Sequence, residues 1–82
     1  MVHGVVQGVG FRISLARVAR TRGAAGWVRN RVDGAVEAVL EGDREVVDGI
    51  VEWCREGPRG ARVDRVDVDD ETVEGLAAFE IR

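Results

Sequence analysis

The opening stretch from Gly4 to Arg12, Gly-Val-Val-Gln-Gly-Val-Gly-Phe-Arg, constrains the fold more than any other part of the chain. A β-prone run of valines leads into it, and an amphipathic helical pattern begins at Phe11. Gly8 and Gly10 lie between the two patterns. The stretch therefore predicts a strand, a glycine loop and a helix start in direct succession.

A loop of this kind can bind an anion. Glycine has no Cβ, so successive backbone N–H groups can turn toward a ligand, and the unpaired N–H groups of the helix start lie just beyond. Arg12 adds a planar fork of donors that matches phosphate oxygens. The same residues also fit a tight connection followed by a solvated arginine, so both interpretations stay open at this point. Ile13 breaks the dinucleotide fingerprint, and the chain has no lysine for a Walker loop.

The periodicities along the whole chain predict two helices and five strands. The helices are expected over residues 11–22 and between Asp43, as N-cap, and Gly57-Pro58; the strands are expected over residues 2–6, 25–31, 35–41, 62–69 and 79–82. We interpret the order as β-α-β-β-α-β, the ferredoxin-like α+β arrangement, with an antiparallel sheet and two helices on one face. The hairpin of the second and third strands is expected in one edge region of the sheet.

Local features give further expectations. Asp33-Gly34 matches the tight-turn chemistry of a β-hairpin, because both residues tolerate positive φ. Val63 falls on the opposite face from Val66, which predicts a bulge or a later strand start. The inward faces are expected to carry Phe11, Leu15, Val18 and Ala19 in the first helix, and Phe79 and Ile81 in the last strand.

Composition limits the class of protein. The 82 residues form one domain, 1–82, with a net charge of −3, which argues against general affinity for nucleic acid or an anionic membrane. Cys54 is the only cysteine, so we expect no internal disulfide and a buried, inert thiol. No run is apolar enough to span a bilayer, and we expect a cytoplasmic monomer. Met1 begins almost inside the first strand, which leaves a longer natural chain open.

Other polar residues have simpler interpretations than a catalytic role. The acidic stretch 67–74 lacks the spacing and glycine of an EF-hand, so we expect a solvated loop and no metal site. His3 is expected to have a structural role in the first strand, and Trp27 to pack on the sheet. Asn30, taken alone before a turn, is typical of turn formation.

Together the motifs resemble the acylphosphatase family. The resemblance rests on Gly4-x-Val6-Gln7-Gly8-Val9-x-Phe11-Arg12, on Gly26-Trp27-Val28-x-Asn30-x-x-Asp33-Gly34, on Gly57-Pro58 before Ala61-x-Val63, and on Phe79-x-Ile81. These motifs span nearly the whole chain in order. The resemblance implies the same sandwich fold and the hydrolysis of a small carboxyl phosphate, without a metal or organic cofactor.

The resemblance also implies roles for individual residues. Arg12 corresponds to the arginine that binds the phosphate, and Asn30 to the residue that holds the attacking water. The phosphate cradle would be the backbone amides of Gln7, Gly8, Val9, Gly10, Phe11 and Arg12. The resemblance implies no separate role for the side chain of Gln7, and the sequence is compatible with a side chain that shapes the loop.

Two alternatives stay open. The chain could be the acylphosphatase-like part of a carbamoyltransferase that matures hydrogenases, although the zinc-finger cysteines that follow such a domain are absent here. It could also be a binding module on the same fold, such as an RNA-recognition domain. That function needs aromatic residues on the central strands and usually a basic surface, which this composition does not favour.

Overall fold

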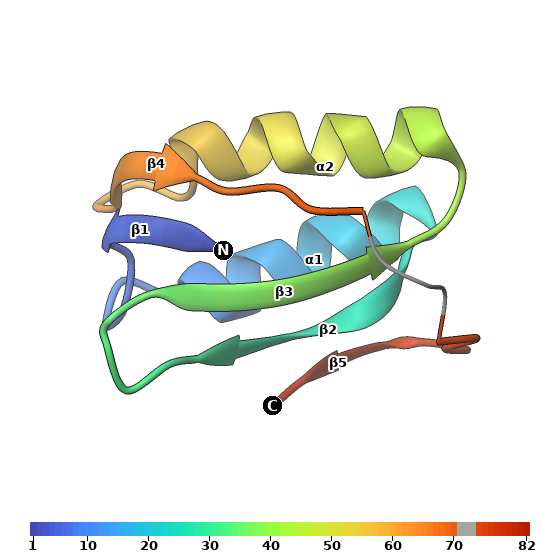
Figure 1. The fold of residues 1–82 in the computed structure, drawn as a ribbon, viewed down its shortest axis with the longest axis horizontal. Coiled ribbons are helices and arrows are strands. Elements are labelled where there is room, and N and C mark those ends of the chain that lie inside the picture. The colour runs from blue at the N-terminus through green and yellow to red at the C-terminus, as the bar shows by residue number, and fades with distance from the viewer. Residues whose placement is uncertain (71–73) are drawn as a thin grey trace.

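The computed structural model describes residues 1–70 and 74–82 and contains five strands and two helices (Figure 1). The elements are β1 (Val2–Val5), α1 (Phe11–Arg22), β2 (Ala25–Asn30), β3 (Val36–Glu41), α2 (Arg44–Glu56), β4 (Arg62–Val66) and β5 (Phe79–Ile81). The strands form one sheet in the order β4-β1-β3-β2-β5, and in Figure 1 α1 lies behind the strands while α2 runs along the top. The predicted ferredoxin-like fold is confirmed.

The pairing of β5 corrects two details of the expected sheet. The β1–β3, β1–β4 and β2–β3 pairs are antiparallel, as predicted, but β5 is parallel to β2. β5 is additional to the six elements of the predicted β-α-β-β-α-β pattern. β4 lies at one edge of the sheet, and β5 lies at the opposite edge, next to β2. The β2–β3 hairpin is therefore interior, because β5 occupies the edge position beyond β2.

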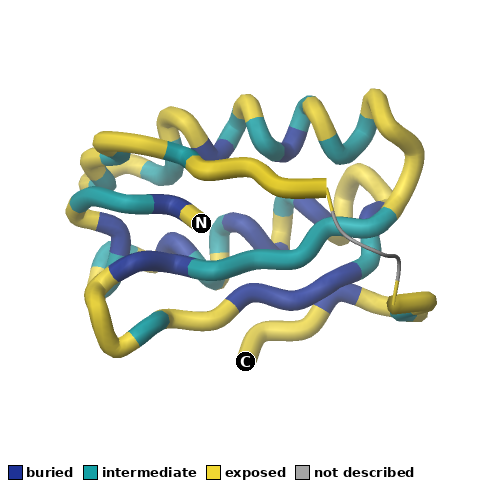
Figure 2. The backbone as a smooth tube through the Cα atoms, in the orientation of Figure 1, coloured by how far each residue is buried: buried dark blue, intermediate teal, exposed yellow. Residues whose placement is uncertain are grey.

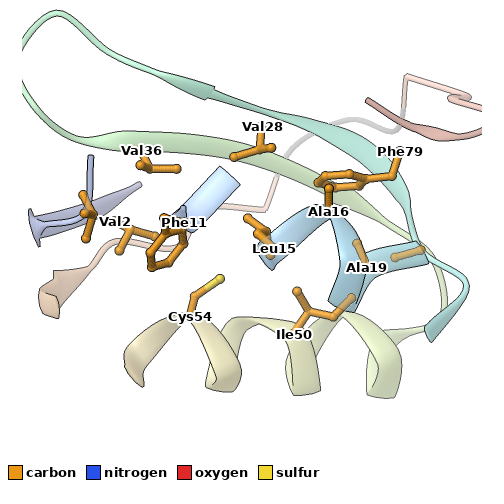
Figure 3. Close-up of a cluster of buried hydrophobic side chains, with 12 residues drawn as sticks. Val2, Phe11, Leu15, Ala16, Ala19, Val28, Val36, Ile50, Cys54 and Phe79 are labelled. Carbon is orange, nitrogen blue, oxygen red and sulfur yellow. The ribbon is translucent and has the colours of Figure 1, made fainter. Parts of the chain in front are cut away.

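The core lies between the sheet and the two helices (Figures 2 and 3). The predicted inward face of α1 is confirmed, since Phe11, Leu15 and Ala19 are buried and Val18 packs against them at the edge of the core. Phe11 also meets Trp53 of α2, with ring centroids 5.5 Å apart in a tilted arrangement. Phe11 is the first residue of α1, and its side chain is buried in this core. Its burial therefore fixes where the helix begins relative to the sheet.

The last strand buries one of the two side chains that were expected to face the core. Phe79 is 3% exposed and Ile81 is 41% exposed, so only the first of the two side chains expected to be inward is buried. β5 is an edge strand with a partner on one side only, so its end is covered less completely than its start.

The bulge expected in the fourth strand is confirmed. The β1–β4 register shifts between His3 and Gly4, because His3 pairs with Arg65 and Gly4 with Val63. One additional residue in β4 lets Val63 and Val66, three positions apart, both pack against the core.

The fourth strand ends at Val66, three residues before the predicted end. Asp67 still exchanges backbone hydrogen bonds with Met1. Val68, beyond this pair, is 54% exposed. Of the acidic stretch that follows, residues 71–73 lie outside the described residues, while Asp69 and Asp70 are exposed as predicted.

The β2–β3 turn lies where the sequence predicts it, between the expected strands 25–31 and 35–41. Arg31 N–H donates to the Ala35 carbonyl at 2.8 Å, so the turn spans residues 32–34. Gly34 alone has positive φ, at 93°, while Asp33 acts through its side chain and accepts a hydrogen bond from Ala35 N–H at 3.1 Å. A three-residue turn with glycine in the left-handed region keeps the two strands in register.

Gly49→Ala should stabilise the protein. Gly49 lies inside α2, where glycine costs about 1 kcal/mol relative to alanine. A Cβ at this position would meet Arg22 Nη1 at 2.7 Å, and this atom is the end of a long, exposed side chain that can move aside. We expect a gain of up to about 1 kcal/mol in the free energy of unfolding, seen as a higher urea midpoint with an unchanged slope. A lower midpoint would show that the Arg22 side chain cannot move.

The buried thiol should be unreactive in the folded protein. Cys54 is 4% exposed, and burial raises its pKa to about 12. Only the thiolate is nucleophilic, so at pH 8 we expect alkylation by iodoacetamide only after unfolding in denaturant. Mass spectrometry of native and denatured samples measures this difference. Rapid alkylation of the native protein would contradict the assigned burial.

Candidate active site

The glycine loop joins the end of β1 at Val5 to the start of α1 at Phe11. Gly8 and Gly10 have φ of 75° and 76°, in the left-handed region, and a Cβ at either position would point into open space. Gly10 is the N-cap of α1, so no side chain caps the helix. The first turn also lacks an acidic residue. The loop and the helix start thus present backbone N–H groups and the positive end of the helix dipole to an exposed surface.

Arg12 extends from the first turn of α1 toward the end of β5. Its Nη1 donates a hydrogen bond to the Arg82 carbonyl at 3.2 Å, and the Arg82 N–H donates to the Val28 carbonyl of β2 at 2.8 Å. The end of β5 therefore orients the Arg12 guanidinium and is itself attached to β2. A guanidinium has five N–H donors, so most remain for an anion.

Asn30 is the last residue of β2 and is exposed. Val28, two positions earlier, is completely buried among the core residues between sheet and helices. Side chains alternate along a strand, so Asn30 leaves the sheet on the same face, the face that α1 covers. It also lines an open hollow of about 450 Å³ together with Arg29, Arg31, Val32 and Asp33. Arg12 and Asn30, predicted from distant motifs, therefore share one face of the sheet.

Gln7 connects the loop directly to the β2–β3 hairpin. Its Nε2 donates to the Arg31 carbonyl at 2.7 Å and to the Ala35 carbonyl at 3.0 Å. Arg31 immediately follows Asn30 in the chain. The glycine loop is thus attached to the segment that carries Asn30, which the sequence did not indicate.

Ion pairs hold the carboxylates of the hairpin. Arg29 pairs with Glu37 at 2.6 Å, and Arg31 pairs with Asp33 at 3.3 Å. The hydrogen bond from Ala35 N–H, followed by the contact with Arg31, lowers the pKa of the Asp33 carboxyl below its ordinary value. The lowered pKa keeps the Asp33 carboxylate ionised at neutral pH, and Arg31 offsets its charge.

Two other candidate residues have the structural roles expected of them. His3 of β1 contacts Asp67, the residue after β4, with its Nε2 2.9 Å from the carboxylate. The hydrogen bond from Arg65 lowers the pKa of Asp67 most, followed by the one from His3. Trp27 is 8% exposed, and the guanidinium carbons of Arg29 and Arg82 lie 5.4 and 4.9 Å from its ring centroid. Trp27 therefore packs on the sheet between two cations.

Neither a metal cluster nor a membrane span is found within residues 1–70 and 74–82. These residues contain no group of three or more His, Cys, Asp or Glu side chains able to hold a metal ion. In the same ranges, neither helix is long and apolar enough to cross a membrane.

Comparisons with known proteins agree with this geometry. The family model for Acylphosphatase matches residues 1–81. An acylphosphatase of Thermococcus kodakarensis is 54% identical over 80 residues, covering 98% of this chain and 88% of that relative. The structure of an acylphosphatase from Coxiella burnetii superposes with a TM-score of 0.96 at 40% identity, covering 99% of this chain and 85% of that one.

A longer protein contains the same fold. The structure of T. kodakarensis HypF matches with a TM-score of 0.82 at 36% identity, covering 98% of this chain but 11% of HypF. The curated acylphosphatase, in contrast, is matched over most of its own length. The family model, the sequence relative and the fold agree, and the chain belongs to the acylphosphatase family.

Proposed function

We propose that the glycine loop, Arg12 and Asn30 form the active site of an acylphosphatase, which hydrolyses R–CO–O–PO₃²⁻ to a carboxylate and inorganic phosphate. Family membership supports this reaction class. One observation supports the residue roles: Arg12 and the uncapped start of α1 lie on the same face of the sheet as Asn30, and Gln7 joins the loop to the hairpin.

The loop and Arg12 would hold the phosphoryl group. Backbone N–H groups of residues 7–12 and the guanidinium donate hydrogen bonds to its oxygens, and the helix dipole favours its negative charge. Fixed donors of this kind stabilise charge in the transition state without having to reorganise during the reaction. The ion-paired carboxylates of the hairpin add little repulsion toward the bound dianion.

Asn30 would orient the attacking water. Its side-chain carbonyl accepts a hydrogen bond from water, and its amide nitrogen can donate one, but an amide is no useful base. Water attacks phosphorus, the bond from phosphorus to the bridging oxygen breaks, and a phosphate oxygen takes the proton. The leaving carboxylate has a pKa of about 4, by analogy with Asp and Glu, so it needs no general acid. Positioning and charge stabilisation then account for most of the catalysis.

The partners included in this proposal are small acyl phosphates, with the chain acting as a cytoplasmic monomer that binds neither nucleic acid nor membranes. The RNA-binding alternative is disfavoured because Trp27 and Phe79, the aromatic residues of β2 and β5, are buried instead of presented for base stacking. The chain is 54% identical to the T. kodakarensis acylphosphatase and 36% identical to T. kodakarensis HypF, which favours the acylphosphatase reaction.

The test is turnover of benzoyl phosphate in buffer that contains EDTA, with carboxylate and phosphate both measured. We expect turnover of the wild-type protein at a rate that EDTA does not change. Arg17→Ala, at an exposed position of α1, is the matched control for loss of positive charge and should retain the wild-type rate. Absence of turnover in wild-type protein with a folded circular dichroism spectrum would overturn the proposal.

A further inference from the structure

We propose that Gln7 is a positioning residue that fixes Asn30 relative to the phosphate-binding loop; this inference rests on the proposed function. Gln7 lies at the start of the loop and is half-buried. Its amide group has two N–H bonds, and its Nε2 contacts two hairpin carbonyls, those of Arg31 and Ala35. This leaves no side-chain donor for a phosphate. Its effect on the reaction must therefore be indirect.

The two acceptors lie on opposite arms of the hairpin. The Arg31 carbonyl belongs to the residue that follows Asn30, and the Ala35 carbonyl precedes β3 and also accepts the Arg31 N–H at 2.8 Å. Gln7 therefore bridges both arms at the point where the hairpin closes. A shift of the hairpin relative to the loop would break one or both bonds.

The hairpin has few other restraints at this end. Val32 at its tip is completely exposed, and Asp33 and Gly34 are exposed as well. Within the described part of the chain, Gln7 makes the only side-chain hydrogen bonds that join the loop to residues 31–35. Small displacements of catalytic groups are costly, since about 1 Å can reduce a rate roughly a hundredfold. Gln7 thus sets the distance from the Asn30-bound water to phosphorus.

Gln7→Met tests this role, because it keeps the length of the side chain and removes both N–H donors. We expect kcat for benzoyl phosphate to fall about 10-fold to 100-fold, while the inhibition constant of inorganic phosphate stays within about threefold, since the loop amides and Arg12 remain. In an Asn30→Ala background, the same substitution should lower kcat by less than about threefold further, because its effect passes through Asn30. Gln7→Glu, which replaces the donors with acceptors, should lower kcat as well, and its negative charge at the loop should also weaken phosphate binding.

Arg20→Met is the matched control. Arg20 also makes two side-chain hydrogen bonds to a distant backbone carbonyl, from Nε and Nη2 to Phe79 at 3.2 and 2.8 Å, but it connects α1 to the start of β5. A general loss of stability would affect kcat in both variants. We expect the wild-type kcat in Arg20→Met and the reduced value only in the Gln7 variants.

A measurement independent of turnover separates this inference from the proposed function. Backbone ¹⁵N order parameters of residues 30–35 should fall in Gln7→Met, and those of α1 should not change. The positioning role would be overturned by unchanged order parameters, or by a Gln7→Met kcat within about twofold of wild type. It would also be overturned if the kcat of the double variant fell by the product of the two single-variant reductions. Absence of wild-type turnover would overturn the proposed function, and the order parameters would still decide whether Gln7 positions Asn30.

Discussion

Arg12→Ala should abolish phosphate binding and turnover together. The guanidinium is the one side-chain cation of the proposed cradle, and the Arg82 carbonyl already orients it. Loss of a single preorganised donor costs about a hundredfold to a thousandfold in kcat, and arginine supplies several donors and a full charge. We therefore expect kcat/KM for benzoyl phosphate to fall at least about a thousandfold. A ³¹P or ¹⁵N NMR titration should show no saturable binding of inorganic phosphate.

Arg12→Lys separates charge from geometry at the same position. Lysine keeps the positive charge but lacks the planar fork, so it should recover part of the phosphate affinity and little of the turnover. If Arg12→Ala instead kept phosphate affinity within about threefold of wild type, the assignment of Arg12 to the cradle would be wrong.

Asn30→Ala should lose turnover while it still binds phosphate. The substitution removes the group proposed to orient water, at an exposed position where little packing is lost. We expect kcat to fall about a hundredfold to a thousandfold, with the inhibition constant of inorganic phosphate nearly unchanged. Steady-state kinetics with phosphate as competitive inhibitor measures both quantities in one experiment.

Asn30→Asp provides the contrasting variant. Its carboxylate can accept a hydrogen bond from water, but it adds a negative charge beside the phosphate, so we expect weaker phosphate binding as well as slow turnover. Near-normal kcat in Asn30→Ala would contradict the water-orienting role. Equal losses of phosphate binding and kcat in Asn30→Ala would place Asn30 in the cradle instead.

Local patterns predicted most of the fold. The bounds of α1 and its inward face follow from the spacing of Phe11, Leu15 and Ala19. In a regular strand Val63 and Val66 would face opposite sides of the sheet, and this mismatch indicated the β4 bulge. Tertiary contacts decided the features that were predicted incorrectly. Ile81 has good strand character, but its exposure depends on an edge position that periodicity does not encode. The parallel pairing of β5 likewise depends on where the chain crosses the sheet.

The resemblance supplied the residues of the proposed site, but the contacts that connect them were not predicted. Arg12 and Asn30 were identified by resemblance, and the structure places them on one face of the sheet. The contact between Arg12 and the Arg82 carbonyl joins residues 70 positions apart, and those of Gln7 span 24 and 28 positions. No local pattern records such separations, because they arise only when the sheet assembles.

The most direct test of the central claim is the fate of solvent oxygen during hydrolysis of benzoyl phosphate in H₂¹⁸O. Water oriented by Asn30 toward a phosphoryl group held by the loop and Arg12 must attack phosphorus. A single turnover should therefore place ¹⁸O in the inorganic phosphate and leave the benzoate unlabelled, as mass spectrometry of both products would show. Label in the benzoate would mean attack at the carbonyl carbon, and would contradict the proposed roles of both residues.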